Sequence, residues 1–168
     1  MTQSPIHLIP CDLKIFECIL KGDQHIAAHL NINVPNQWTE FGSPAFEYGN
    51  KKIQEDPSSS KWWTYLPIYK ESNTLIGSCG FKGPPNDKGH VEIGYEVAKL
   101  YRNKGYASEM AKQLIHIATN DKEVKSIIAH TLADKNASVS ILQKFNFILV
   151  EEINDPEDGL IWKWQLNL

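Results

Sequence analysis

The sequence has few cysteines, no long apolar run and no surplus of basic residues. Its three cysteines, Cys11, Cys18 and Cys79, form no CxxC motif and no paired spacing. This pattern argues against a disulfide framework or a zinc site and favours a reducing compartment. No stretch approaches the roughly 20 apolar residues that span a bilayer, and the start, MTQSPIHLIP, lacks the features of a secretory signal. We therefore expect a cytoplasmic protein without a membrane partner.

The charge balance limits the partners further. The 168 residues include 17 Lys and Arg against 20 Asp and Glu, a formal net charge of −3. Because nucleic-acid binders usually carry a basic surplus, no nucleic-acid partner is expected. The six histidines are scattered without the spacing of a metal site, so no metal is expected. The length and the 42% share of hydrophobic residues suit a single domain over residues 1–168.

Hydrophobic periodicity predicts alternating groups of strands and helices. Helices are predicted at 11–30, in two pieces broken near Gly22, then over the amphipathic stretch 107–118 and at 136–145. Strands are predicted at 6–9, 62–69, 74–81, 90–97, 124–132, 147–153 and 159–166. Residues 31–61 show no clear period, so they are either functional or contain a helix whose bounds the pattern does not give. The order indicates a mixed α/β (α+β) fold, with a mixed sheet flanked by helices.

The stretch YRNKGYASEM, residues 101–110, opens the helix at 107–118 with a basic, glycine-containing turn. The first N–H groups of a helix have no partner within it, and the helix dipole adds partial positive charge there. Gly105 allows close approach of the backbone, while Arg102 and Lys104 add cationic charge. From these residues alone the turn is either a site for an anion such as a phosphate or a solvated helix start.

The motif R-x-x-G-x-A, after an alternating strand and before an amphipathic helix, resembles the pyrophosphate loop of the GNAT superfamily of CoA-dependent N-acetyltransferases, Q/R-x-x-G-x-G/A. The successive stretches TLIGSCGF, HVEIGYEV, LYRNKGYASEM and NASVSILQKFNF resemble the motifs of the branch with the ribosomal-protein acetyltransferases RimJ and RimL. This resemblance covers residues 74–150. It implies a GNAT-like, mostly antiparallel mixed sheet of about six to seven strands, splayed in the middle and flanked by about four helices.

The resemblance also implies an activity. We expect an acetyl-CoA-dependent N-acetyltransferase that moves an acetyl group to a primary amine, a protein N-terminus or a small molecule, by direct attack on the thioester. Acetyl-CoA and the amine acceptor are then the partners, and a homodimer is allowed for. The alternative is an acyl-CoA-binding module with weak or lost catalysis. It arises because many relatives protonate the thiolate with a tyrosine at the position of Leu142, and this helix has none.

Cofactor-binding residues follow from the resemblance. The backbone of Tyr95, Glu96 and Val97 would pair with the pantetheine arm as an added strand. Asn136 would contact the pantetheine arm or a catalytic water, although the family asparagine aligns one residue earlier, with Lys135. The pyrophosphate would be bound by the backbone N–H groups of Arg102, Asn103, Lys104, Gly105, Tyr106 and Ala107.

The chemistry requires a neutral amine, so a general base or a water relay to one is useful. Glu92 is the leading candidate, because it lies on the polar face of the strand at 90–97, close to where several GNAT enzymes keep a glutamate base. Glu96, on the same face, is second. Both also fit solvated carboxylates. Ser138 either donates a hydrogen bond to the leaving sulfur or satisfies the N-terminus of its helix.

Aromatic residues gather in and beside residues 31–61, where GNAT enzymes build the acceptor pocket. They serve either that pocket or the core. They are Trp38, Phe41, Phe46, Tyr48, Trp62 and Trp63.

Overall fold

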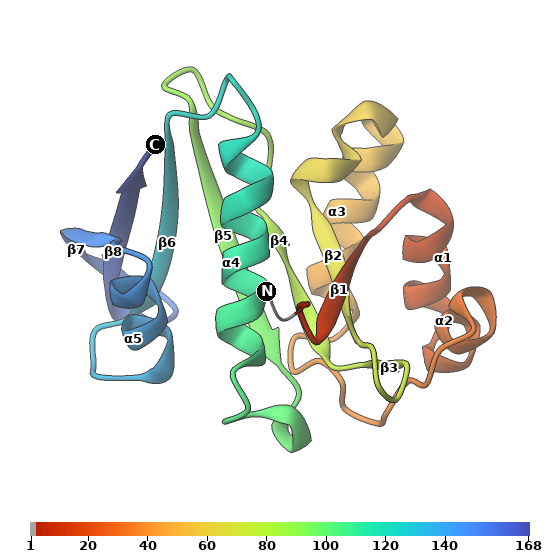
Figure 1. Ribbon diagram of the computed structural model, residues 1–168. Coiled ribbons are helices and arrows are strands. Elements are labelled where there is room, and N and C mark those ends of the chain that lie inside the picture. Colours follow the sequence, from red (N-terminus) through yellow and green to blue (C-terminus); the bar gives the residue numbers. More distant parts are fainter. Residues whose placement is uncertain (1–2) are drawn as a thin grey trace. The chain divides into compact units, whose positions relative to one another are not determined.

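The computed structural model describes residues 3–168 (Figure 1). Its helices are α1 Leu13–Lys21, α2 Asp23–Leu30, α3 Ser43–Glu55, α4 Tyr106–Thr119 and α5 Ala137–Lys144, with short 3-10 helices η1 Pro57–Trp62 and η2 Lys99–Tyr101. Its strands are β1 Ile6–Pro10, β2 Thr64–Tyr69, β3 Thr74–Leu75, β4 Gly77–Phe81, β5 His90–Val97, β6 Ser126–Leu132, β7 Ile148–Asp155 and β8 Gly159–Asn167.

The strands form one open, mostly antiparallel sheet. Their hydrogen-bonded order is β1-β2-β4-β5-β6-β8-β7, and β3 pairs with β2 off this path. The predicted mixed α/β fold class is therefore confirmed. Within residues 3–168, no helix is both long and apolar enough to cross a membrane.

The chain divides into two compact units, each built from two stretches of sequence. The first unit comprises the chain up to Gly80 together with Tyr95–Met110, and the second comprises Phe81–Gly94 together with Ala111–Leu168. Each boundary falls inside a regular element, namely β4, β5 or α4. A single N-acetyltransferase domain over residues 1–168 stays a prediction.

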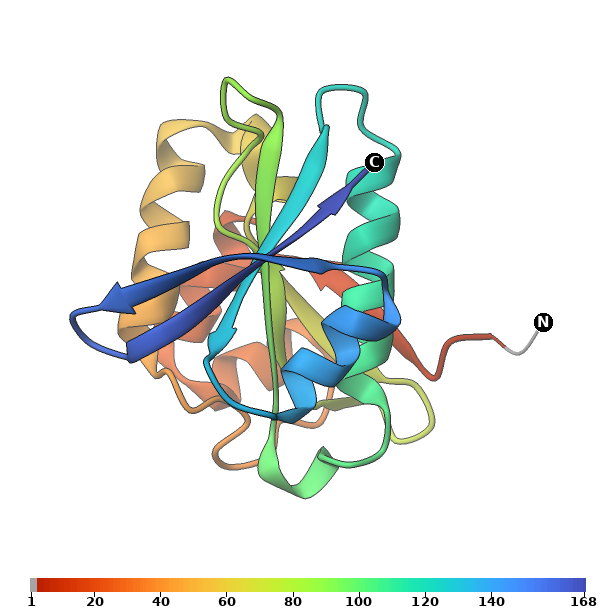
Figure 2. The ribbon, with the colours of Figure 1, turned by 90° about the vertical axis from the view of Figure 1, so that its left-hand side faces the viewer.

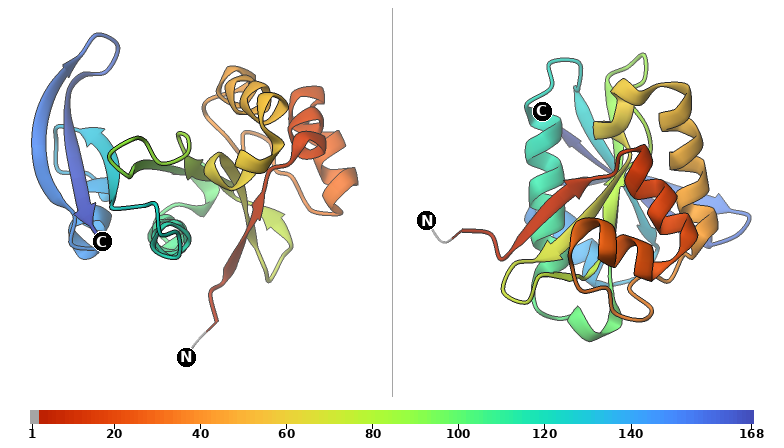
Figure 3. Two further views of the ribbon diagram at one scale, coloured as in Figure 1. Left: turned by 90° about the horizontal axis from the view of Figure 1, so that it is seen from above. Right: turned by 90° about the vertical axis from the view of Figure 1, so that its right-hand side faces the viewer.

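The first unit packs three helices beside β1 and β2. β1 runs antiparallel to β2, with Ile6 opposite Tyr69, and α1, α2 and α3 lie side by side (Figures 1 and 3). The carboxylate of Asp12 caps α1 by accepting a hydrogen bond from the Ile15 amide at 2.8 Å. Gly22 separates α1 from α2 with a φ of 121°, at the predicted break. The buried core of this unit includes Phe16, Ile26, Phe46, Ile53, Leu66 and Ile68.

Residues 31–61 contain a helix, α3, that the periodicity did not locate. Pro44 lies in its first turn, where a missing N–H costs nothing. Phe46, Gly49 and Ile53 are its buried residues. A Cβ on Gly49 would lie 2.9 Å from Cζ of Phe16 in α1, so the glycine permits a close contact between the two helices. The apolar stripe of α3 is thus interrupted by a residue that normally disfavours helices.

The predicted strand at 74–81 divides into β3 and β4. β3 places Leu75 opposite Ile68 of β2, whereas β4 places Cys79 opposite Tyr65, so the register shifts by one residue between them. A Cβ on Gly77, just after the shift, would lie 2.1 Å from the Glu96 carbonyl oxygen. This division gives eight strands where the sequence pattern predicted seven segments.

The second unit is built on the start of β5 and on β6, β7 and β8. β5 pairs in parallel with β6 over His90–Glu92. β8 runs antiparallel to both β6 and β7 and lies between them; the β7–β8 hairpin is drawn in blue in Figure 2. Buried Trp164 of β8 donates from Nε1 to Oγ1 of Thr131 in β6 at 3.0 Å. This bond fixes β8 against β6.

Candidate functional site

The turn between β5 and α4 belongs to the first unit and is shaped by two residues of positive φ. After β5 ends at Val97, η2 turns the chain, Asn103 adopts a φ of 60° and Gly105 a φ of 82°. Asparagine and glycine tolerate this left-handed region better than other residues. A Cβ on Gly105 would meet nothing within 4 Å, so open space lies in front of the turn.

The amides of this turn are available to a ligand. In the part of the chain that the structure describes, the N–H groups of residues 103–107 donate no hydrogen bond. The first helical bond at this end is donated by the Glu109 amide to the Gly105 carbonyl. The Arg102 amide differs, because it donates to the Lys99 carbonyl at 3.3 Å. Five successive residues therefore present unpaired donors at the positive end of a helix, and all of them except buried Tyr106 are exposed or half-buried.

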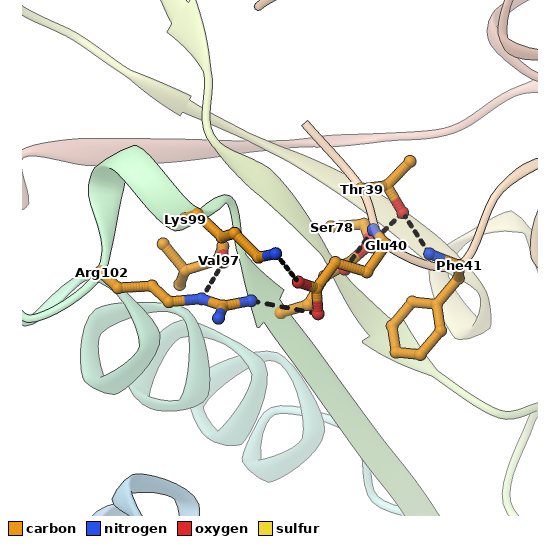
Figure 4. Close-up of polar contacts among 8 residues, drawn as sticks. Thr39, Glu40, Phe41, Ser78, Val97, Lys99 and Arg102 are labelled. Atoms are coloured by element: carbon orange, nitrogen blue, oxygen red, sulfur yellow. Dashed lines mark hydrogen bonds and ion pairs between the residues drawn. The ribbon is translucent and has the colours of Figure 1, made fainter. Parts of the chain in front are cut away.

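The Arg102 side chain is held on both sides of its guanidinium (Figure 4). Nε donates to the Val97 carbonyl at 2.9 Å, and Nη2 lies 3.2 Å from Oε2 of Glu40. The other carboxylate oxygen of Glu40 lies 3.7 Å from Nζ of Lys99. One exposed carboxylate thus neutralises part of the cationic charge beside the turn.

The Glu96 carboxylate anchors the segment at residues 39–41. Oε1 accepts hydrogen bonds from Oγ1 of Thr39 at 2.5 Å and from Oγ of Ser78 at 2.8 Å. Oε2 accepts from the Glu40 amide at 3.1 Å. Because three donors converge on it, this carboxylate is engaged in structure, which argues against Glu96 as the second candidate for a base.

The backbone of β5 alternates in the direction of its hydrogen bonds. Toward β4, the Glu92 carbonyl accepts from the Lys82 amide, and the Ala98 amide donates to the Ile76 carbonyl. In an antiparallel ladder these bonding residues alternate with residues whose groups face the other edge. The backbone N–H and C=O groups of Tyr95 and Val97 therefore face away from β4. A strand added at that edge would require this orientation.

The start of α4 is fixed by an aromatic contact. Tyr106, the first residue of α4, is 9% exposed. Its ring lies 5.3 Å from that of Tyr69 in β2, measured between centroids. The hydroxyl of Tyr69 in turn donates to the carboxylate of Glu71. The turn is thus anchored at both ends. The Arg102 side chain binds the Val97 carbonyl at the end of β5, and the Tyr106 ring packs against Tyr69 of β2.

Glu92 lies in the second unit, within a small charged cluster. Its Oε1 is 2.9 Å from Nδ1 of His130 in β6 and also pairs with Nζ of Lys82. The side chains of Glu92 and His130 are each 25% exposed, whereas that of Lys82 is 63% exposed. Glu92 and Glu96, which the sequence placed on the same face of one strand, therefore have different partners in different units.

The start of α5 contains the remaining predicted residues. Oδ1 of Asn136 accepts from the Val139 amide at 3.0 Å, so Asn136 is the cap of this helix. Its Nδ2 donates to Asp134. Half-buried Ser138 follows in the first turn, and its hydroxyl makes no hydrogen bond to other described residues. Leu142, where relatives carry a tyrosine, is a core residue with 1% exposure.

Two residues of these clusters were missed from the sequence. Glu40 belongs to a segment without periodicity, and it meets Arg102 only because the chain folds back over 62 positions. In the sequence, His130 is one of six scattered histidines. Its contact with Glu92 joins two strands and therefore leaves no local pattern. Of the aromatic residues considered for an acceptor pocket, Trp38 and Phe46 are buried, whereas Phe41 is 64% exposed. Among residues 3–168, no three His, Cys, Asp or Glu side chains form a group that would hold a metal.

Known proteins resemble this chain in sequence and in fold. The profile of the acetyltransferase (GNAT) domain family matches residues 18–148. An uncharacterized N-acetyltransferase of Bacillus subtilis (strain 168), YjdG, is 27% identical over 146 residues, which is 86% of each chain.

Solved structures share the fold. The ribosomal-protein-S5-alanine acetyltransferase of Vibrio fischeri superposes with a TM-score of 0.71 at 11% identity, over 99% of this chain and 95% of the other. The ribosomal L7/L12 α-N-protein acetyltransferase RimL, in complex with coenzyme A, gives a TM-score of 0.69 at 14% identity, over 100% and 97% of the two chains.

Proposed function

Since the chain belongs to the GNAT acetyltransferase family, we propose that it transfers the acetyl group of acetyl-CoA to a primary amine by direct attack on the thioester. The proposal rests on one observation: the backbone amides of residues 103–107 donate no hydrogen bond, and they lie in the turn at the start of α4. An anion is the natural ligand of such a row. The family identity makes the diphosphate of CoA the specific anion.

The turn suits a diphosphate in shape and charge. The five amides are the donors, Gly105 leaves the approach open, and Lys104 adds an exposed positive charge. Arg102 contributes through its side chain, which ties the turn to Val97, because its own amide already donates to Lys99. The pantetheine arm would pair with the edge of β5 at Tyr95 and Val97, whereas the backbone groups of Glu96 face β4.

The remaining roles are assigned to the second unit. The cluster around Glu92 would take the proton that the attacking amine loses. Ser138, which has no partner within the described residues, would donate a hydrogen bond to the sulfur as the C–S bond breaks. Asn136 caps α5, the helix whose first turn contains Ser138, by accepting from the Val139 amide. Its side chain would also contact the pantetheine arm or a water.

The acceptor is a protein N-terminus or a small amine. One structural neighbour is named for the alanine of ribosomal protein S5, and others are named spermidine N-acetyltransferases. Both acceptor types carry the required primary amine. The alternative function, an acyl-CoA-binding module, is favoured by one observation: buried Leu142 replaces the tyrosine that protonates the thiolate in many relatives.

Release of free CoA thiol from acetyl-CoA tests the proposal. The purified protein is assayed against peptides beginning with Ala or Ser, peptides with an internal lysine, and polyamines, and the acetylated product is identified by mass spectrometry. We expect product with at least one of these amine classes. CoA binding without product in any class would favour the binding module, and absence of CoA binding would reject both functions.

A further inference from the structure

We propose that His130 is the base that takes the amine proton, with Glu92 as the residue that positions it. This inference rests on the proposed acetyl transfer and assigns its proton acceptor. It starts from the contact between Nδ1 of His130 and Oε1 of Glu92, at 2.9 Å. The two side chains come from the neighbouring strands β6 and β5, whose parallel pairing runs to Glu92 opposite Ile128. His130 lies two residues beyond that pair, with its side chain on the same face as Ile128.

The contact fixes the tautomer of the imidazole. An ionised carboxylate only accepts hydrogen bonds, so Nδ1 must carry the proton that is donated to Glu92. In the neutral ring, Nε2 then has a lone pair. No hydrogen bond involves Nε2 in the part of the chain that is described, and the side chain is 25% exposed. His130 thus presents Nε2 as a basic nitrogen without a hydrogen bond, while Glu92 holds the imidazole ring through Nδ1.

Glu92 is less free to react than the histidine it holds. Its Oε1 accepts from His130 and also pairs with the Lys82 ammonium. Both partners contact the same carboxylate oxygen, so that oxygen is already engaged when an amine approaches. The same negative charge, however, stabilises the imidazolium that forms when His130 becomes protonated. Glu92 is therefore better suited to orient His130 and balance its charge than to react itself.

The proton transfer balances without a further reactant. The amine nitrogen forms a bond to the thioester carbon as its proton moves to Nε2 of His130, directly or through one water. The C–S bond then breaks, its electron pair stays on the sulfur, and the imidazolium returns the proton to the thiolate or to solvent. Besides acetyl-CoA and the amine, the step needs no oxidant, reductant or third substrate.

Several charged groups face His130. Lys163 of β8 is directly opposite it in the register, and Glu151 of β7 pairs with Lys163 at 3.2 Å. The pKa of Asp155 in β7 is lowered, mainly by backbone hydrogen bonds from Asp158 and Glu157. A charged His130 contributes a smaller lowering. The charged groups on this face, besides His130, are Lys82, Glu92, Glu151, Asp155 and Lys163.

The experiment compares His130→Asn with Glu92→Gln, using His90→Asn as the control. His90 lies on the same face of β5 as Glu92 but has no place in the mechanism. At neutral pH, His130→Asn should lower kcat by about 10²–10⁴-fold, the usual contribution of a general base, with CoA affinity unchanged. Glu92→Gln should cost less, because Nε2 remains. It should lower kcat without raising the KM for acetyl-CoA, since the carboxylate holds the imidazole and does not contact the cofactor. His90→Asn should match the wild type.

Each outcome decides the question. A larger loss from Glu92→Gln than from His130→Asn would make Glu92 the base and overturn this inference, while leaving acetyl transfer intact. Near-wild-type kcat in His130→Asn would do the same. A wild type that binds no CoA or acetylates no amine would instead overturn the proposed function and, with it, this inference.

A readout independent of activity and of variant folding is available in the wild type. The ¹⁵N chemical shifts of the His130 ring report which nitrogen carries the proton. We expect the Nδ1–H tautomer at neutral pH. The Nε2–H tautomer would remove the free basic nitrogen and overturn the inference even if the variants fail to fold.

Discussion

At the scale of single residues, Gly105 decides whether the turn before α4 accepts an anion. Gly105→Ala should strain the backbone at a φ of 82° and place a methyl group in the open space before the amides. We expect CoA affinity to fall about tenfold or more, which corresponds to at least about 1.4 kcal/mol. Isothermal titration with CoA measures this.

Gly159 provides a matched control for that substitution. It has a φ of 75°, its Cβ position also meets nothing within 4 Å, and it lies in the β7–β8 turn. Gly159→Ala should destabilise the fold by a similar amount without changing CoA affinity. An equal loss of affinity in both variants would mean that backbone strain alone explains the result, and the turn would then be only a helix start.

Glu96 carries the second prediction at this scale. Glu96→Ala leaves the hydroxyls of Thr39 and Ser78 and the Glu40 amide without their acceptor. An unmet buried or half-buried donor costs about 1–3 kcal/mol, so the free energy of unfolding should fall by an amount in that range. Urea denaturation measures it, with exposed Glu47→Ala as the control. A change below about 0.5 kcal/mol, as for an ordinary surface position, would show that the three bonds do not hold the segment.

At the scale of elements, the segment at residues 39–41 is coupled through Glu40 to the turn before α4, the proposed site of the CoA diphosphate. Glu40→Gln removes a negative charge beside Arg102 and Lys99. Exposed ion pairs are worth about 0.2–1 kcal/mol, so CoA should bind up to about fivefold more tightly at low salt. Because salt screens such charges, the gain should shrink at 0.5 M NaCl. Unchanged affinity at both salt concentrations would separate Glu40 from the anion site.

The elements also show what the sequence could and could not predict. Periodicity located α1, α2 and their break at Gly22, because the apolar stripes are regular there. It did not locate α3, because Gly49 interrupts the apolar stripe of that helix. The glycine allows a close contact with Phe16. The turn at 101–107 was recognised from its motif, and the structure added the unpaired amides on which the proposed anion site rests.

The charged clusters were beyond reach of the sequence for a different reason. Glu92 and Glu96 alternate identically along one strand, so no local pattern distinguishes them. Only the strands beside β5 do so: Ser78 in β4 contacts Glu96, and His130 in β6 contacts Glu92. Side-chain chemistry of this kind depends on pairing between distant segments, which a single sequence does not display.

At the scale of the whole molecule, CoA should stabilise the fold by mass action. A ligand bound only by the native state contributes about 2.7 kcal/mol at 100 times its Kd, which for a domain of this size raises Tm by about 5–10 °C. Differential scanning fluorimetry measures the shift. Pantetheine, which lacks the diphosphate, should shift Tm far less. Equal shifts with both ligands would locate the binding energy outside the turn.

The cysteines provide a global probe of opening. Cys11 and Cys79 are buried, and burial raises the pKa of both thiols above the ordinary value. Cys18 is buried as well. Because the thiolate is the reactive form, native protein should resist iodoacetamide at pH 8, whereas protein in urea should be alkylated at all three positions. Rapid labelling of the native protein would reveal opening of the first unit that the static structure does not show.

The position of β8 between β6 and β7 has a consequence for synthesis of the chain. Gly159–Asn167 follows both β6 and β7 in the chain, yet it contributes the central partner of the β6–β8–β7 sheet. Neither β6 nor β7 can complete its hydrogen bonding there before β8 has been synthesised. Folding of this unit therefore waits for β8, and a nascent chain arrested before residue 159 should remain sensitive to protease over β6 and β7.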